Sequence, residues 1–149
     1  YDYIALSVVP MFGLLSTLIA IYLRLKISSS TVSLKERLAF HVPFSVYLGW
    51  ITVASIADVA AALVSVNWDG FGLSGTVWSI LVIVVALVIT LAVLATRRDL
   101  AYCAVILWAL IGIIAKHGDN TSIATTAEVS AIVIVASLVS VLLLARMRK

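Results

Sequence analysis

Five long apolar runs follow one another along the chain, separated by short polar segments. Each run is roughly 16–24 residues long, close to the ~20 residues that a helix needs to cross ~30 Å of hydrocarbon. The pattern predicts an all-α fold, a multi-pass transmembrane helical bundle with five transmembrane helices. In a single domain of residues 1–149, the expected spans cover about residues 4–25, 43–66, 77–95, 100–115 and 124–145.

The polar segments between the runs contain helix-capping and turn-forming residues. Ser33 is followed three residues later by Glu36, which is the spacing of a capping box and predicts a short interfacial helix. Pro43 then opens or kinks the second run. Ser74 or Thr76 is expected to cap the third run. Turn-forming residues predict further breaks at residues 67–72, 97–99 and 118–121.

The composition supports a membrane location. Hydrophobic residues make up 64% of the chain and charged residues 11%, against roughly 45–50% and 25% in soluble domains. Such a chain cannot cover itself with polar surface, so its predicted partner is the lipid bilayer and not a nucleic acid. The single cysteine, Cys103, excludes an internal disulfide and a cysteine-based zinc site.

The basic residues lie almost entirely on one side of the predicted membrane. If the five helices alternate in direction, nine of the ten Lys and Arg residues share a side and only Lys116 lies opposite. The positive-inside rule makes that side cytoplasmic, with the N-terminus outside and the C-terminus inside. Because the chain starts at Tyr1 without Met, and an outside N-terminus suits an odd number of preceding helices, we expect the natural gene to encode further helices before it.

The runs differ in side-chain size, which predicts their positions in the bundle. The third is nearly all Val, Ile and Leu and is expected to face lipid. The second is rich in alanine, and the fifth carries Ala127 and Ser130 near one face. Small residues let helices approach closely, so the second and fifth runs are predicted to form the packed interior.

Asp58 is the most informative polar residue. It lies inside the second run, about eight residues or ~12 Å from the outer end. An acid at such a depth is costly and usually faces a cavity or a partner, which favours a contact with a ligand, a proton or a cation. The alternative is a protonated or hydrogen-bonded acid that bridges two helices through Ser or Thr. Trp50 lies two turns earlier on about the same face, so the two could line a pocket for a flat ligand.

Glu128 lies at a similar depth near the start of the fifth run, so it could meet Asp58 in one polar pocket. The alternative is a capping box with Thr125, which would place Glu128 at the start of a helix. His41 and His117 lie at opposite membrane edges and are more typical of solvated side chains than of haem ligands. No constellation suggests catalysis or a metal site, so no enzyme is predicted.

Residues 42–58 resemble the last helix of the tryptophan-rich sensory protein (TspO, translocator protein) family. Trp50, Ala54 and Asp58 keep the family's spacing of Trp, Ala and Asn, with Asp58 in the place of the asparagine. The first run is similar to the preceding family helix, and residues 68–72 are similar to a loop of long bacterial members. The resemblance implies the C-terminal part of such a long form, in a bacterial cytoplasmic (inner) membrane, with three upstream helices absent.

The same resemblance implies a non-enzymatic protein that binds a hydrophobic ligand, such as a porphyrin or related tetrapyrrole, or a sterol. Residues 18–24 also match a loose cholesterol-contact pattern. The ligand-binding residues would be Trp50, Ala54, Asp58 and Glu128. Two alternatives remain: a structural or accessory subunit that docks other membrane subunits or copies of itself, and a proton-coupled small-molecule transporter that uses Asp58 and Glu128.

Overall fold

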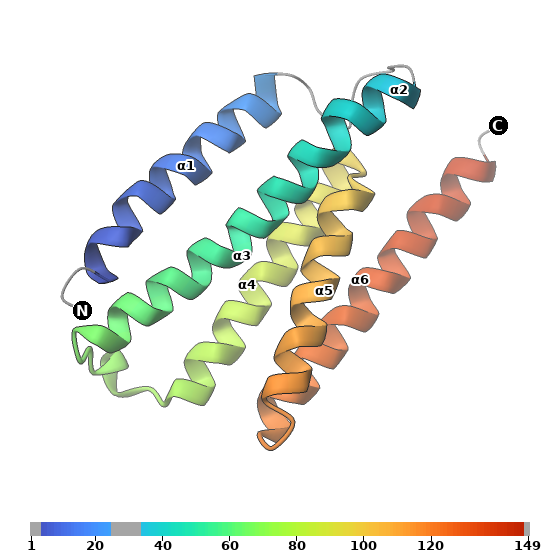
Figure 1. Ribbon diagram of the computed structural model, residues 1–149. Helices are drawn as coiled ribbons and strands as arrows, with labels where there is room; N and C mark the ends of the chain where they lie inside the picture. Colours follow the sequence, from blue (N-terminus) through green and yellow to red (C-terminus); the bar gives the residue numbers. More distant parts are fainter. Residues whose placement is uncertain (1–3, 25–33, 148–149) are drawn as a thin grey trace. The chain divides into compact units, whose positions relative to one another are not determined.

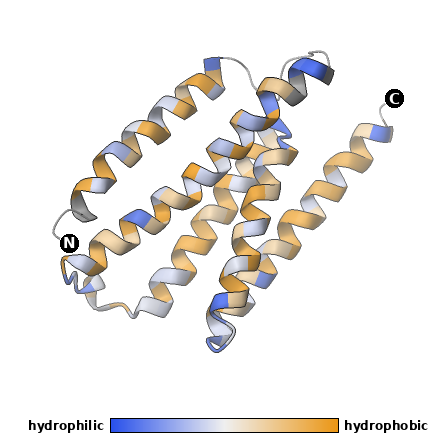
Figure 2. Ribbon diagram, viewed as in Figure 1, coloured by the Kyte–Doolittle hydropathy of each residue, from blue (hydrophilic) through white to orange (hydrophobic). Residues whose placement is uncertain are grey.

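The computed structural model describes residues 4–24 and 34–147. The predicted capping residue Ser33 lies outside this part of the chain. The protein divides into two compact units, Tyr1–Leu73 and Ser74–Lys149, and each is considered by itself. The expectation of a single domain stays a prediction. Hydrophilic residues gather toward the helix ends, and hydrophobic residues occupy most of the helical turns between them (Figure 2).

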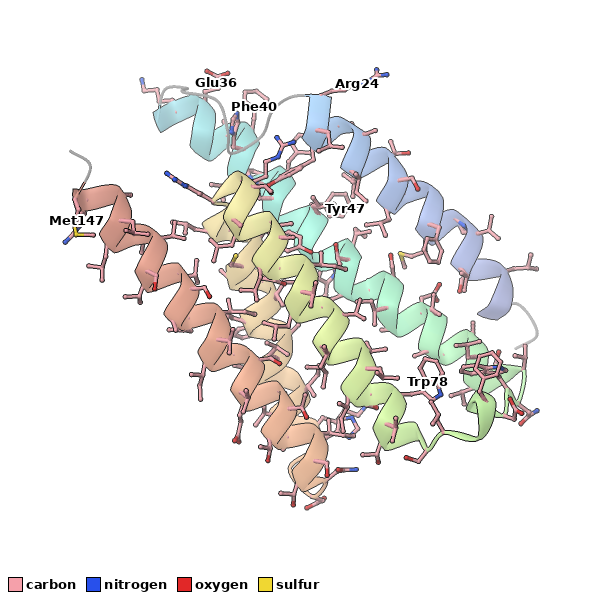
Figure 3. All side chains as sticks on the ribbon, turned by 180° about the vertical axis from the view of Figure 1, so that it is seen from behind. Arg24, Glu36, Phe40, Tyr47, Trp78 and Met147 are labelled. Carbon is pink, nitrogen blue, oxygen red and sulfur yellow. The ribbon has the colours of Figure 1, made fainter. Side chains whose placement is uncertain are left out.

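The first unit is a helical hairpin made by α1 (Ile4–Arg24) and α3 (Val42–Ser65), which pack side by side (Figure 1). On α1, Leu18 and Tyr22 are buried, one turn apart. On α3, Leu48, Ser55 and Ala62 are buried and recur every seven residues. This period keeps one side of a helix against its neighbour, as in a coiled coil. Arg24 and Glu36 lie at the same end of this unit (Figure 3).

The short helix predicted before the second run is not a separate element, because it continues into α3. A three-residue turn, α2 (Leu34–Glu36), continues through a π-helical segment, η1 (Arg37–His41), directly into α3. Pro43 lies directly after the π-helical segment, in the first turn of α3, so the helix continues through the proline and does not begin there. The segment Ala39–Ser65 is therefore one continuous apolar helix of 27 residues.

A structured loop closes the first unit, as the turn-forming residues predict. Asn67, Gly70, Phe71 and Gly72 all have positive φ, and the last three form the short helix η2 (Gly70–Gly72). The Asp69 carboxylate accepts a hydrogen bond from the Phe71 backbone N–H at 3.1 Å. The rings of Trp68 and Phe71 meet edge to face, with centroids 5.1 Å apart. The loop thus has a defined shape that presents aromatic side chains.

The second unit contains α4 (Gly75–Arg97), α5 (Leu100–Lys116) and α6 (Thr121–Met147), joined by short turns. Helix α6 packs against both α4 and α5. Trp78, near the start of α4, and Met147, the last residue of α6, lie at opposite ends of this unit (Figure 3). Helices α4 and α6 therefore end on the same side, and α5 begins there.

Polar side chains begin each helix of this unit. Ser74 accepts from the Val77 N–H at 3.4 Å and caps α4, which confirms one of the two predicted caps. Asp99 caps α5 by accepting from the Tyr102 N–H at 3.1 Å. Asn120 accepts from the Ile123 N–H at 3.3 Å and also donates to the Thr76 hydroxyl at 3.0 Å. Asn120 thereby connects the α5–α6 turn to the start of α4.

The core of the second unit lies where α6 crosses the other two helices. Helix α4 contributes only a few buried residues, among them Thr90, while most of its aliphatic side chains are exposed or partly exposed, as expected of a lipid-facing helix. Ala127, Ser130 and Ile134 of α6 are essentially inaccessible. The buried residues of α5 are Tyr102, Cys103, Ile106 and Leu110.

The five predicted long helices are confirmed within the described part of the chain, each within a few residues of its expected ends. Four of them, including the 27-residue α6, are long and apolar enough to cross a membrane. Helix α5 has 17 residues and is shorter than these. The architecture is that of a helical membrane bundle.

Candidate functional site

The Asp58 carboxylate links the two helices of the first unit. The Ser7 hydroxyl, in the second turn of α1, donates a 2.7 Å hydrogen bond to Asp58 Oδ1, near the end of α3. The antiparallel hairpin places these two positions at the same depth. Asp58 is therefore an acid that bridges helices through a serine, as the alternative interpretation of the sequence expects.

Two polar atoms beside this bond have no hydrogen-bond partner. Asp58 Oδ2 and the Ser55 hydroxyl are inaccessible and unpaired. Ser55 is 4% exposed, and its spacing of three residues from Asp58 puts both on one side of α3. A buried polar group without a partner costs free energy, so the pair favours any species that supplies hydrogen bonds. A hydrogen-bonding polar group of a ligand is such a species.

Trp50 and Ala54 lie on α3 in the two turns before Asp58. Trp50 is 56% exposed, and Ala54 is half-buried. Eight residues of α-helix separate Trp50 from Asp58 by about 80° around the helix axis. The structure accordingly directs Trp50 outward and Asp58 toward α1, with Ala54 between them. The prediction that Trp50 and Asp58 share one face holds only approximately.

Glu128 belongs to the second unit. It is exposed on α6, and α6 begins at Thr121, after the Asn120 cap. The predicted capping box with Thr125 is therefore wrong, because Asn120 starts the helix about one turn earlier. A pocket that Glu128 shares with Asp58 stays a prediction.

The remaining sequence candidates have structural positions of their own. His41 is 8% exposed and so is not a solvated side chain, whereas His117 follows the end of α5. Leu18 and Tyr22 of the cholesterol-contact pattern are buried in the hairpin and are not available to a sterol in the bilayer. Within residues 4–24 and 34–147, no three His, Cys, Asp or Glu side chains gather as they would around a metal ion.

The sequence interpretation did not identify Ser7 or Ser55 as members of the site. Both are single hydroxyls in apolar helices, a common and uninformative feature. A signal was available for Ser7, since in an antiparallel hairpin of the first two runs it falls at the depth of Asp58. Ser55 could be found from its one-turn spacing to Asp58 on a face of small residues.

Together, the long apolar helices and the acid inside one of them define an integral membrane protein built from helices, with a polar cluster in its first hairpin. The chain belongs to the family of TSPO-like proteins, whose sequence model matches residues 1–140. The resemblance to the TspO family is thus confirmed. Membership indicates a membrane sensory or binding protein, in a family that is generally non-enzymatic. No curated protein and no solved structure matches the chain significantly.

Proposed function

We propose that this protein binds a hydrophobic ligand, such as a tetrapyrrole, beside α3 at Trp50, Ala54 and Asp58. One observation carries the proposal. A membrane-spanning helix holds two unpaired polar atoms, Asp58 Oδ2 and the Ser55 hydroxyl, within two turns of an outward-facing tryptophan. Natural proteins rarely leave buried polar groups unpaired, and such groups are often functional.

The residues fit the chemistry of a tetrapyrrole. Its flat aromatic macrocycle would stack on the exposed indole of Trp50. A donor at the edge of such a ligand, for example a protonated carboxyl group, is the kind that an unpaired carboxylate oxygen of Asp58 accepts. Ala54 has only a methyl side chain, so no bulky group separates the indole from the acid.

The proposal predicts that Trp50→Ala weakens binding of protoporphyrin IX roughly tenfold, because losing a stacked indole costs about 1.4 kcal/mol or more. Binding is followed through the change in the porphyrin absorption band during titration of the detergent-solubilised protein. The matched control is Trp108→Ala on α5, since Trp108 is also highly exposed, at 70%. Equal affinity of both variants and the parent would contradict the site.

The same titration separates the alternative functions. An accessory subunit would show no porphyrin affinity and would purify with partner chains in fixed ratio. A proton-coupled transporter would require a titratable group at position 58, so Asp58→Asn would abolish uptake in vesicles but leave porphyrin affinity unchanged. Tight porphyrin binding that depends on Trp50 supports the binding function over both.

We further propose that the protein resides in a bacterial cytoplasmic membrane with its N-terminus outside and its C-terminus inside. The nine-to-one distribution of Lys and Arg supports this orientation. In intact cells, a membrane-impermeant thiol reagent should label Lys116→Cys, whereas Arg97→Cys should react only after the cells are opened. The native Cys103 is fully buried and should add little background. Labelling in the reverse order would refute the orientation.

A further inference from the structure

The loop that follows α3, residues 66–73, carries little charge for a segment that connects two membrane-spanning helices. We call it the aromatic loop, after Trp68 and Phe71. From Val59 to Thr96 the sequence has a single charged residue, Asp69. The turns after α4 and after α5, by contrast, each contain at least two charged residues. The aromatic loop is therefore unlike a segment that projects into water.

The exposed side chains of the aromatic loop are of two kinds. Val66, Phe71 and Leu73 are exposed and apolar. Asn67 and Asp69 are exposed and polar. Water around the whole loop would leave the apolar group in contact with solvent, and hydrocarbon around it would deprive the polar group of hydrogen-bond partners. The region where lipid headgroups meet the acyl chains suits both kinds.

The backbone of the aromatic loop is largely hydrogen-bonded within the first unit. The N–H groups of residues 66–68 donate to carbonyls in the last turns of α3, at 3.1–3.2 Å. The N–H groups of residues 71–73 donate within the loop, to the Asp69 carboxylate and to the Asp69 and Gly70 carbonyls, also at 3.1–3.2 Å. Irregular backbone enters a membrane only where its polar groups are satisfied. These bonds lower the cost of placing the loop among lipids.

Phe71 occupies a costly backbone conformation. Its φ of 54° and ψ of 31° are left-handed, between Gly70 and Gly72, which also have positive φ. Glycine adopts this conformation more easily than a residue with a Cβ atom. The Phe71 ring touches Trp68 edge to face, yet the residue is 79% exposed. The loop thus holds a large apolar side chain outward at a conformational cost, which indicates a contact outside the unit.

We propose that the aromatic loop lies at the boundary between lipid headgroups and acyl chains, with the Phe71 ring among the acyl chains. The loop is continuous with a membrane-spanning helix, so the bilayer is the occupant that already surrounds its neighbour. A water-soluble partner protein would also cover Phe71, but it would leave the low charge and the paired backbone unexplained. Because α3 ends at Ser65, seven residues after Asp58, an anchored loop holds this acid about 10 Å deeper in the membrane.

The first test measures the depth of position 71 in phosphatidylcholine vesicles that contain the full chain. A nitroxide spin label is attached to Phe71→Cys, and its collisions with oxygen, which concentrates in lipid, are compared with those with a water-soluble nickel chelate. The control is Asp119→Cys, an exposed position in the charged turn after α5. The ratio of oxygen to chelate collisions should be severalfold higher at position 71. The native Cys103 is fully buried and should add little signal.

The second test asks whether the Phe71 side chain holds the loop at this depth. The label is placed at Leu73→Cys, alone and together with Phe71→Gly or Phe71→Leu. Glycine removes the ring and relieves the positive φ, so the fold should persist while the label moves toward water and meets the chelate severalfold more often. Leucine keeps an apolar side chain and should leave the label near its original depth.

Three results would overturn the proposal. A label at position 71 that meets the chelate as often as the label at position 119 would place the loop in water. A label shielded from both reagents would show that a protein chain covers Phe71. A label at position 73 that Phe71→Gly does not move would show that Phe71 is not the anchor.

Discussion

Replacing Asp58 by leucine should destabilise the α1–α3 hairpin by about 1–2 kcal/mol. The variant removes the acceptor of the 2.7 Å bond from Ser7 and puts a branched side chain at the helix contact. Hydrogen bonds between membrane helices contribute about 0.6 kcal/mol on average and up to about 1.7 kcal/mol, and the altered packing adds to this. Denaturation of the purified protein by graded sodium dodecyl sulfate measures the change in detergent. In both the folded and the dodecyl-sulfate-denatured protein, α3 is surrounded by apolar chains. The more favourable transfer of leucine into an apolar medium is therefore the same in both states and does not hide the loss of stability.

Asp58→Asn is the matched control, because it keeps the shape and the hydrogen-bond acceptor without the charge. Asparagine also stands at this position in the resembling TspO proteins, so stability should stay within about 0.5 kcal/mol of the parent. A fall in porphyrin affinity in this variant would then identify a role for the acid itself. Either of two results would contradict a role of Asp58 in the proposed site. One is an Asp58→Leu variant as stable as the parent, and the other is a porphyrin affinity equal to the parent's in both variants.

Substituting Ala127 by leucine should destabilise the second unit by about 3 kcal/mol. Ala127 is completely buried on α6, where that helix packs against α4 and α5. Three additional carbon atoms at such a contact force the helices apart, and overpacking of this kind costs roughly 1–3 kcal/mol or more. A methyl side chain is what allows the close approach. Thermal unfolding in detergent, followed by circular dichroism, would measure the loss.

Ala136→Leu on the same helix serves as the comparison, since Ala136 is exposed. It makes the same chemical change on the same element without a packed neighbour, so its effect should be within about 0.5 kcal/mol. If both substitutions cost the same, the loss would arise from α6 itself, and the packing of α6 against α4 and α5 would not be its cause.

The helices could be predicted closely because each depends on local features of the chain. An apolar run that must cross hydrocarbon has its length set by the bilayer, and its ends are set by polar residues that cannot enter. Ser74 illustrates the point, since a serine directly before an apolar run has few other structural roles. The family could also be recognised, because the spacing of Trp50, Ala54 and Asp58 lies within one helix.

The wrong or missing predictions concern two kinds of feature. One is a helix start at which two residues could each act as the cap, and the other is a contact between two different helices. Asn120 and Thr125 are both acceptable caps, and the earlier one wins because it also bonds to Thr76 across the unit. No pattern within a single run shows which helix lies beside Asp58. Its partner Ser7 is 51 residues away in the sequence, and the pairing depends on how α1 and α3 pack. The bond itself could therefore be assigned only from the structure.

The unequal lengths of α5 and α6 have a consequence for the surrounding bilayer. At 1.5 Å per residue, the 17 residues of α5 extend about 25 Å and the 27 residues of α6 about 40 Å. A hydrocarbon core of about 30 Å is too thick for one and too thin for the other. Helix α6 must tilt strongly or protrude, and the lipids beside α5 must compress. The two helices therefore favour opposite bilayer thicknesses, and the membrane around this unit should be thinner beside α5 than beside α6.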